Sequence, residues 1–117
     1  MVDLLLVREK NMQSFTMLVI NWVKPGCEGE YRHLVEPVLD TMRYEPTFIN
    51  TVLHEDAEDS TRFMLYETWA DRDDFFDVQM KKSYRLELEE ILPGLLRVPR
   101  EITFFKALRG DFSFMPI

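Results

Sequence analysis

The sequence has few of the cysteines and long apolar runs that are typical of secreted and membrane proteins. Its single cysteine, Cys27, excludes an internal disulfide and is typical of a protein from a reducing compartment. The first ten residues contain an apolar run of only four residues, Leu4 to Val7. Such a run is too short for the apolar region of a signal peptide or for a membrane span. We therefore expect a cytoplasmic protein without a membrane partner.

Basic residues are also in the minority. The chain has 14 lysines and arginines against 21 acidic residues, which gives a net charge of −7. Binding to nucleic acid requires a basic patch that neutralises phosphates. The one basic cluster, formed by Lys81, Lys82 and Arg85, is too small to supply such a patch. We expect no nucleic-acid partner.

The length of 117 residues is typical of one domain, and no internal repeat or low-complexity stretch divides it. At this size roughly two-thirds of the surface of the unfolded chain can be buried, which is enough for one hydrophobic core. The predicted domain covers residues 15–108. Residues 1–14 form an N-terminal arm in this interpretation, and residues 109–117 form a C-terminal tail.

The spacing of apolar residues predicts alternating strands and helices. The apolar stretches 15–23, 47–55, 62–69 and 100–108 are typical of strands. Helical spacing over residues 28–43 predicts an amphipathic helix, and Pro37 is expected to bend it or to confine regular hydrogen bonding to its two halves. A second helix is predicted from an N-cap at Asp71, with Ser83 as the cap of a continuation that ends at the Pro-Gly pair at 93–94. The apolar stripe of the first helix consists of Tyr31, Leu34, Val35, Val38, Leu39 and Met42.

The predicted order of elements is therefore β-α-β-β-α-β. This order is typical of the ferredoxin-like α+β fold. We expect an antiparallel sheet with strand order 4-1-3-2 and both helices on one of its faces.

The predicted sheet is apolar on both faces. In the first strand Met17 and Val19 alternate with Leu18 and Ile20, and the fourth strand is similar. Because two helices can cover only one face, we expect a second copy of the chain to cover the other, as in a homodimer. The alternative is that the arm and the tail of the same chain fold over this face.

Three short motifs follow the predicted elements in order. "KPG" (24–26) follows the first strand, "YEP" (44–46) follows the first helix, and "FMLYETWAD" (63–71) contains the third strand. In order and spacing they resemble the antibiotic biosynthesis monooxygenase family of dimeric α+β barrels, over about Phe15 to Leu108. The resemblance implies a homodimer of ferredoxin-like subunits. It also implies a small-molecule activity, since some members oxidise polyphenols to quinones without a cofactor and others degrade haem.

Asn21 and Trp69 are the catalytic candidates that the resemblance implies. The alternatives are a strand-edge or bulge position for Asn21 and core packing for Trp69. The family's oxygenases and haem degraders use an asparagine on the first strand and a tryptophan on the third. We expect these strands to be parallel neighbours, so that both side chains lie at the same strand ends. The amide NH₂ of Asn21 and the indole N–H of Trp69 would then donate hydrogen bonds to a phenolate or to reduced dioxygen.

Glu67 is the third catalytic candidate, because a spacing of two residues places it on the same strand face as Trp69. If burial raises its pKa toward neutrality, Glu67 would serve as a general base. The alternative is a framework acid paired with a cation. Cations available in the sequence for such a pair are Lys106, Arg43 and Arg62.

The second helix carries the substrate-binding candidates Phe76, Met80 and Tyr84. Core packing is the alternative role for Phe76 and Met80. For Tyr84 and the neighbouring Arg85 the alternative is a solvated surface.

The segment after the third strand contains no histidine. Many family members carry histidines in the region that corresponds to residues 71–90, and the haem-degrading relatives use one as the iron ligand. The histidines of this sequence, His33 and His54, lie elsewhere. We therefore expect no metal and no cofactor.

The predicted function is that of a cofactor-independent monooxygenase whose partners are dioxygen and a small aromatic molecule of polyphenol or quinol type. In a dry pocket the substrate phenol loses a proton, and its anion passes an electron to dioxygen. The alternative is a non-catalytic barrel that binds a small molecule. The missing histidines favour the barrel, whereas the expected pairing of Asn21 with Trp69 favours the enzyme.

Overall fold

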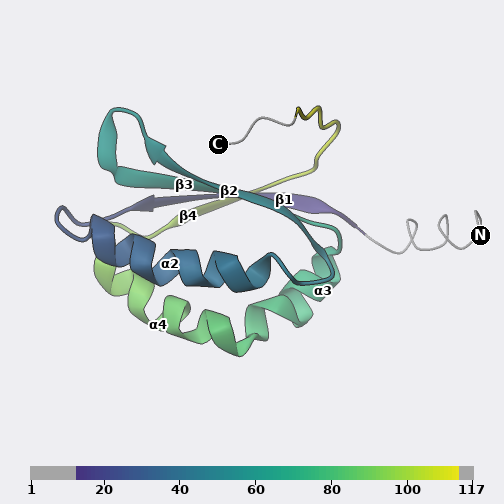
Figure 1. The fold of residues 1–117 in the computed structure, drawn as a ribbon, viewed down its shortest axis with the longest axis horizontal. Helices are drawn as coiled ribbons and strands as arrows, with labels where there is room; N and C mark the ends of the chain where they lie inside the picture. Colours follow the sequence, from purple (N-terminus) through teal and green to yellow (C-terminus); the bar gives the residue numbers. More distant parts are fainter. Residues whose placement is uncertain (1–12, 114–117) are drawn as a thin grey trace, which may run out of the picture.

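The computed structural model describes residues 13–113. A four-stranded antiparallel sheet forms one layer and the helices form the other (Figure 1). The sheet order β2-β3-β1-β4 confirms the predicted ferredoxin-like α+β fold. The strands are β1 (Phe15–Trp22), β2 (Phe48–Asp56), β3 (Asp59–Trp69) and β4 (Glu101–Phe105). Residues 1–12 of the predicted arm and 114–117 of the predicted tail lie outside the described residues.

Strand β4 is shorter than predicted. Its last residue, Phe105, pairs with Thr16, and β1 begins one residue earlier at Phe15. Only Phe15 of β1 lies beyond this pair, so little partner strand remains, and the charged Lys106 interrupts the apolar run that continues to Leu108.

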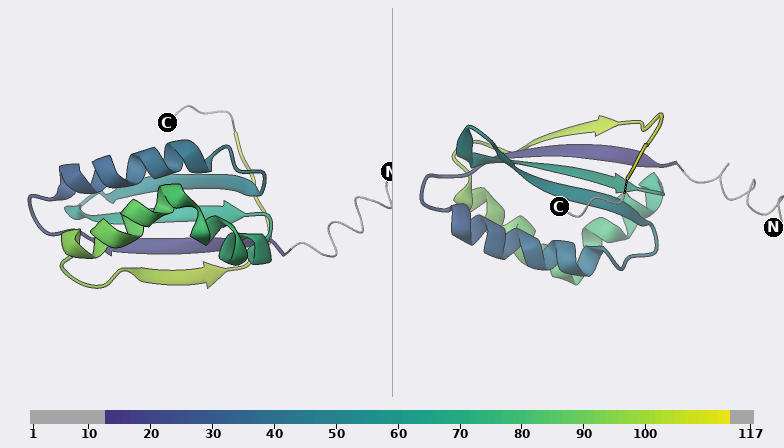
Figure 2. Two further views of the ribbon diagram at one scale, coloured as in Figure 1. Left: turned by 90° about the horizontal axis from the view of Figure 1, so that it is seen from below. Right: turned by 45° about the horizontal axis from the view of Figure 1, so that its top comes forward.

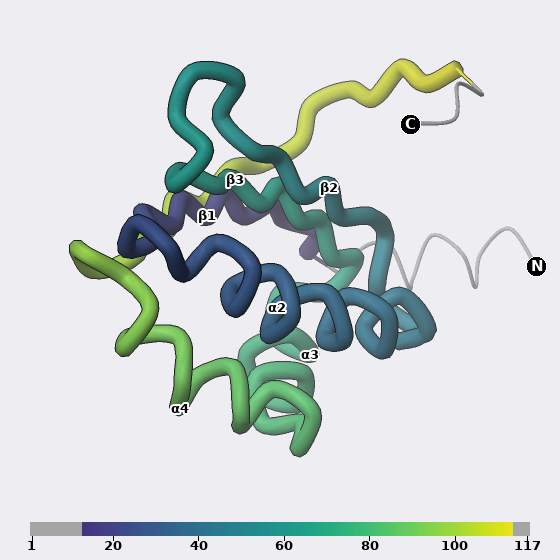
Figure 3. The backbone as a smooth tube through the Cα atoms, turned by 60° about the vertical axis from the view of Figure 1, so that its left-hand side comes forward, coloured from purple at the N-terminus to yellow at the C-terminus, as the bar shows by residue number. Residues whose placement is uncertain are grey.

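Helix α2 (Glu28–Met42) forms as predicted and contains Pro37 within a single helical span. Its apolar stripe lies against the sheet, with Tyr31, Val35 and Met42 buried. Helices α2 and α4 lie side by side on the same face of the sheet (Figures 2 and 3). This part of the prediction is confirmed.

The second predicted helix is divided. It consists of α3 (Arg72–Asp77), two short 3₁₀ turns, η1 (Gln79–Lys81) and η2 (Ser83–Arg85), and α4 (Leu86–Leu95). Lys82 is extended, with φ −65° and ψ 139°, and interrupts the helical path. The side chains of Gln79 and Arg85 are buried in this interrupted segment.

The predicted end of this helix at the Pro-Gly pair is wrong, because α4 continues through Pro93 and Gly94 to Leu95. A proline inside a helix costs about 3 kcal/mol. The last turn places Leu92, Leu95 and Leu96 in the core. Because each buried leucine contributes about 1.5–3 kcal/mol, their burial offsets the cost of the proline.

The core lies between the helices and the inner face of the sheet. Its fully buried large side chains include Trp69, Tyr31, Phe63 and Phe75. Within residues 13–113, no helix is long and apolar enough to cross a membrane.

Candidate functional site

A cavity of about 110 Å³ lies between the inner face of the sheet and the segment that runs from α3 to α4. Apolar side chains form most of its wall. Among them are Phe76 and Met80, which were predicted to bind substrate. The polar residues that line it are Asn21, Glu67, Arg85, Glu89 and Arg100.

Asn21 lies near the end of β1 and is 2% exposed. Its Nδ2 donates a 2.8 Å hydrogen bond to the hydroxyl oxygen of Tyr31 on α2. Among the described residues, its buried Oδ1 has no hydrogen-bond partner. A buried carbonyl oxygen without a partner costs about 1–3 kcal/mol, so a ligand that donates a hydrogen bond here recovers that energy.

Tyr31 is a residue of the site that the sequence analysis assigned only to the apolar stripe of the first helix. Its ring packs on Phe63 with 4.5 Å between ring centroids, and its side chain is fully buried. Burial raises the pKa of its hydroxyl, which therefore stays protonated near neutral pH. The hydroxyl of a buried tyrosine usually has a hydrogen-bond partner. A tyrosine on the apolar stripe of a helix therefore indicates a polar partner in the core, which is the signal that the sequence offered.

Glu67 and Trp69 lie on the same face of β3, as the alternation predicted, and contact each other. The indole Nε1 of Trp69 donates a 2.6 Å hydrogen bond to Oε1 of Glu67. Both residues are buried, and Trp69 is completely covered by neighbours such as Phe48 and Phe75. The indole N–H that was expected to face a substrate is therefore engaged by Glu67.

Arg85 completes this group and corrects the expectation of a solvated side chain. It is 5% exposed, and its Nη2 lies 3.7 Å from Oε1 of Glu67. Its guanidinium also lies over the rings of Trp69 and Phe75, at 5.7 Å and 5.3 Å from their centroids. The extended Lys82 turns the chain so that Arg85 enters the core, which no helical periodicity could indicate.

The three cations considered for Glu67 do not pair with it. Arg62 instead pairs with Asp56 at the hairpin, at 3.0 Å. Arg62 lies on the face of β3 opposite to Glu67, because five residues separate them. Burial raises the pKa of Glu67, and this effect exceeds the lowering by the Trp69 hydrogen bond and by the charge of Arg85.

The expectation that the first and third strands run parallel is wrong. They are antiparallel, with Asn21 opposite Phe63 and Trp69 opposite Phe15. Six residues of β3 therefore separate Trp69 from the position opposite Asn21, a distance of about 20 Å. Glu67 pairs with Met17 and so lies about 14 Å along the strand from Asn21.

The predicted site residues therefore do not form one cluster, and only some of them line the cavity. Asn21 and Glu67 line the cavity near opposite ends, and Phe76 and Met80 line its wall. Trp69 lies behind Glu67 in the core, outside the cavity lining. Tyr84 also lies outside the lining and packs against the core beside Arg85, with burial raising the pKa of its hydroxyl.

Neither histidine lines the cavity, and both His33 and His54 are exposed to solvent. His54 lies within β2 and His33 on the outer surface of α2. The cavity thus offers no imidazole as an axial ligand, and its residues do not fit haem bound in the manner of the haem-degrading relatives. Residues 13–113 contain no group of three or more potential metal ligands.

Comparisons with known proteins agree with this fold. The sequence model described as "Antibiotic biosynthesis monooxygenase" matches residues 14–85. A protein of Pestalotiopsis microspora named "Putative monooxygenase" is 30% identical over 92 residues, which cover 76% of this chain and 75% of that protein.

Solved structures with the same fold come from several bacteria. Rv0793 from Mycobacterium tuberculosis superposes with a TM-score of 0.77 at 18% identity, covering 86% of this chain and 100% of that one. SnoaB from Streptomyces nogalater, described as a cofactor-independent oxygenase, superposes with a TM-score of 0.71 at 16% identity. The SnoaB match covers 84% of this chain and 96% of SnoaB.

Proposed function

Because the chain belongs to the antibiotic biosynthesis monooxygenase family, we propose that it oxygenates a small phenolic molecule without a cofactor, in the cavity beside Asn21. The observation that carries the proposal is the buried Oδ1 of Asn21, which has no partner among the described residues. A phenolic hydroxyl can donate the hydrogen bond that this atom lacks.

In this proposal Asn21 is a hydrogen-bond acceptor, which reverses the donor role expected from the sequence. Its Nδ2 is held by Tyr31, so only the carbonyl end of the amide is available to a ligand. Tyr31 acts as a positioning residue, because its bond fixes which end of the amide faces the substrate.

Arg100 and Glu89 supply the charges at this end of the cavity. Glu101 pairs with Ile20, so the preceding Arg100 lies beside Asn21. The positive charge of Arg100 favours the phenolate over the phenol. Glu89, bound to Arg100 at 2.7 Å and 3.2 Å, accepts the phenolic proton.

The chemistry proceeds from the phenolate. It transfers one electron to dioxygen, and the resulting radicals combine to form a carbon–oxygen bond. The peroxide then breaks its oxygen–oxygen bond, which leaves one oxygen atom on the substrate as a quinone carbonyl. The other oxygen atom departs as water with two hydrogens that came from the substrate, so atoms and electrons balance.

Glu67 and Trp69 have a supporting role in this proposal. Glu67 accepts the indole hydrogen bond and pairs with Arg85, and all three side chains are buried. These three side chains hold β3 against the segment from α3 to α4. Phe76 and Met80 of this segment form part of the cavity wall.

The proposal includes a homodimer. The outer face of the sheet carries Leu18, Tyr66 and Phe105, and the helices all lie on the opposite face (Figure 1). Phe105 and Tyr66 are 51% and 36% exposed. A second copy of the chain that covers this face would remove these apolar side chains from water.

Oxygen uptake tests the proposal, with anthrone or a hydroquinone as substrate. Replacing Asn21 by alanine is expected to lower kcat/KM roughly 10-fold, mainly through a higher KM, because the bound phenol loses its hydrogen-bond acceptor. Asn50→Ala is the matched control, because Asn50 also lies in a strand with an unpartnered Oδ1 but lines a different surface hollow. Asn50→Ala is expected to retain wild-type activity.

A non-catalytic binding barrel is the second candidate, and the absence of an imidazole from the cavity favours it. It predicts that a phenol binds to the wild-type protein and that Asn21→Ala weakens this binding. It also predicts no oxygen uptake in any variant, and that result would contradict the monooxygenase proposal.

A further inference from the structure

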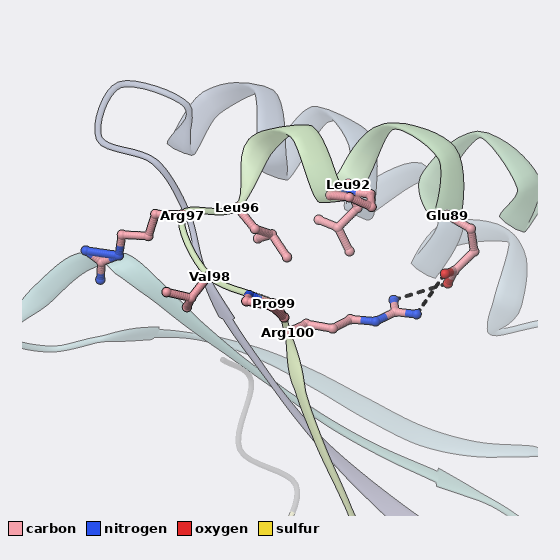
Figure 4. Close-up of a pocket in the computed structure, with 8 residues that line it drawn as sticks. Glu89, Leu92, Leu96, Arg97, Val98, Pro99 and Arg100 are labelled. Carbon is pink, nitrogen blue, oxygen red and sulfur yellow. Dashed lines mark hydrogen bonds and ion pairs between the residues drawn. The ribbon is translucent and has the colours of Figure 1, made fainter.

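A second and larger cavity of about 410 Å³ lies beside the C-terminal half of α4 and the loop that leads to β4 (Figure 4). Its lining is mostly apolar and includes Leu96, Val98 and Pro99. Arg97 also contributes to the lining, but its guanidinium is directed away from Arg100 and pairs with Asp59 at 3.5 Å. We refer to this space as the outer chamber.

The outer chamber adjoins the cavity at Asn21. Three residues, Glu89, Leu92 and Arg100, line both spaces. Figure 4 shows the side chain of Arg100 extended toward Glu89, with both of its terminal nitrogens bound to the carboxylate. The ion pair of these two residues therefore stands at the junction of the two spaces.

We propose that the outer chamber is the second half of the substrate site and binds an apolar alkyl or aryl substituent of the phenol held at Asn21. This inference rests on the proposed function and specifies its substrate class. The inner cavity of about 110 Å³ is small compared with the 410 Å³ beyond the junction. A ligand that occupies both spaces buries apolar surface at each end, and its polar group lies at Asn21 between them.

The junction can admit such a ligand at small cost. The side chains of Arg100 and Glu89 are 29% and 35% exposed. A partly exposed ion pair of this kind contributes about 1 kcal/mol or less, so a small shift of the pair that leaves Arg100 beside Asn21 costs little compared with burying an apolar substituent.

Binding of ortho-alkylphenols tests the inference, since the phenolic ring stays constant while the chain beside the hydroxyl lengthens from ortho-cresol to ortho-octylphenol. Isothermal titration calorimetry is expected to show Kd falling about fourfold for each added methylene that enters the chamber. Val98→Trp places an indole in the chamber without altering the inner cavity. This variant is expected to bind ortho-cresol as the wild type does and to lose the dependence on chain length.

Val78→Trp is the matched control. Val78 is 44% exposed and lies at the end of α3, away from both spaces, whereas Val98 is 46% exposed in the wall of the chamber. Val78→Trp is expected to keep the wild-type dependence. A Kd independent of chain length in the wild type, or the wild-type dependence in Val98→Trp, would overturn the inference. The calorimetry measures binding and does not depend on catalysis. If Kd depends on chain length but no oxygen is consumed, only the proposed monooxygenase activity is overturned.

Discussion

Glu67 is the most unusual residue of the fold, because it is a carboxylate buried in the core beside the cavity. Trp69 and Arg85 both contact it, which partly compensates for its removal from water. Burial still dominates and raises its pKa above the ordinary value of 4.5. The residue therefore makes the stability of the fold depend on pH.

The sign of this dependence follows from the raised pKa. Below pH 4.5 the glutamate is neutral in both the folded and the unfolded chain, and its contribution is fully present. As the pH rises through the higher folded pKa, the unfolded chain ionises more readily and folding loses stability. We expect the free energy of unfolding of the wild type, relative to Glu67→Gln, to fall with rising pH by at most about 1.4 kcal/mol per pH unit.

Urea unfolding of both proteins from acidic to neutral pH measures this difference. Glu87→Gln, which removes an exposed glutamate from α4, is the control and should follow the wild type. A wild-type advantage over Glu67→Gln that grows with pH would contradict the prediction, since it would mean that Arg85 lowers the pKa more than burial raises it.

The face on which a strand residue of the site lies could be predicted, because side chains alternate between the two faces of a strand. The period of two correctly placed Glu67 and Trp69 on one face, and the family motif identified them. The partner Arg85 was not predictable, because it comes from a 3₁₀ turn after an extended residue, where neither strand nor helix periodicity applies. The acceptor role of Asn21 depends on its bond to Tyr31, which joins two elements that the sequence does not show in contact.

At the scale of elements, α3 is too short to be stable alone, since isolated helices below about 12–15 residues are marginal in water. Its six residues follow Asp71, whose carboxylate accepts hydrogen bonds from the backbone N–H groups of Asp73 and Asp74. The helix positions Phe75 and Phe76 in the cavity wall. The cap therefore supports the wall of the proposed site.

Replacing Asp71 by alanine is expected to lower the free energy of unfolding by about 1 kcal/mol, because two backbone donors lose their acceptor. Chemical denaturation measures the change. Asp77→Ala is the matched control at the other end of the same helix, where an acidic residue opposes the helix dipole. An equal loss in both variants would show that Asp71 acts through general surface charge rather than as a cap.

The limits of the elements were less predictable than their type. Pro93 and Gly94 are reliable stop signals in isolation, but the leucines around them gain enough by burial to extend α4. The predicted parallel direction of the first and third strands is also wrong. In a split β-α-β unit the strand inserted between two parallel strands runs opposite to both, so topology should have placed Asn21 and Trp69 at opposite ends.

At the scale of the whole molecule, the two faces of the sheet differ in what covers them. The helices cover the inner face (Figure 2). The outer face presents apolar side chains from β1, β3 and β4, as the strand register shows. Exposing such an apolar surface to water is unfavourable, and a two-fold symmetric dimer would bury it on both subunits. The proposed homodimer thus follows from the same apolar alternation that produced the sheet.

Light scattering coupled to size exclusion tests the pair, with an expected mass twice the 14.0 kDa of one chain at low micromolar concentration. Phe105→Asp is expected to shift the protein to the single-chain mass, because pairing would bury its charge without a partner. The matched control is Leu86→Asp, since Leu86 is 60% exposed on the helical layer and Phe105 is 51% exposed on the outer face. If Leu86→Asp alone separates the pair, the subunits associate through their helices, and the outer face of the sheet is not the interface.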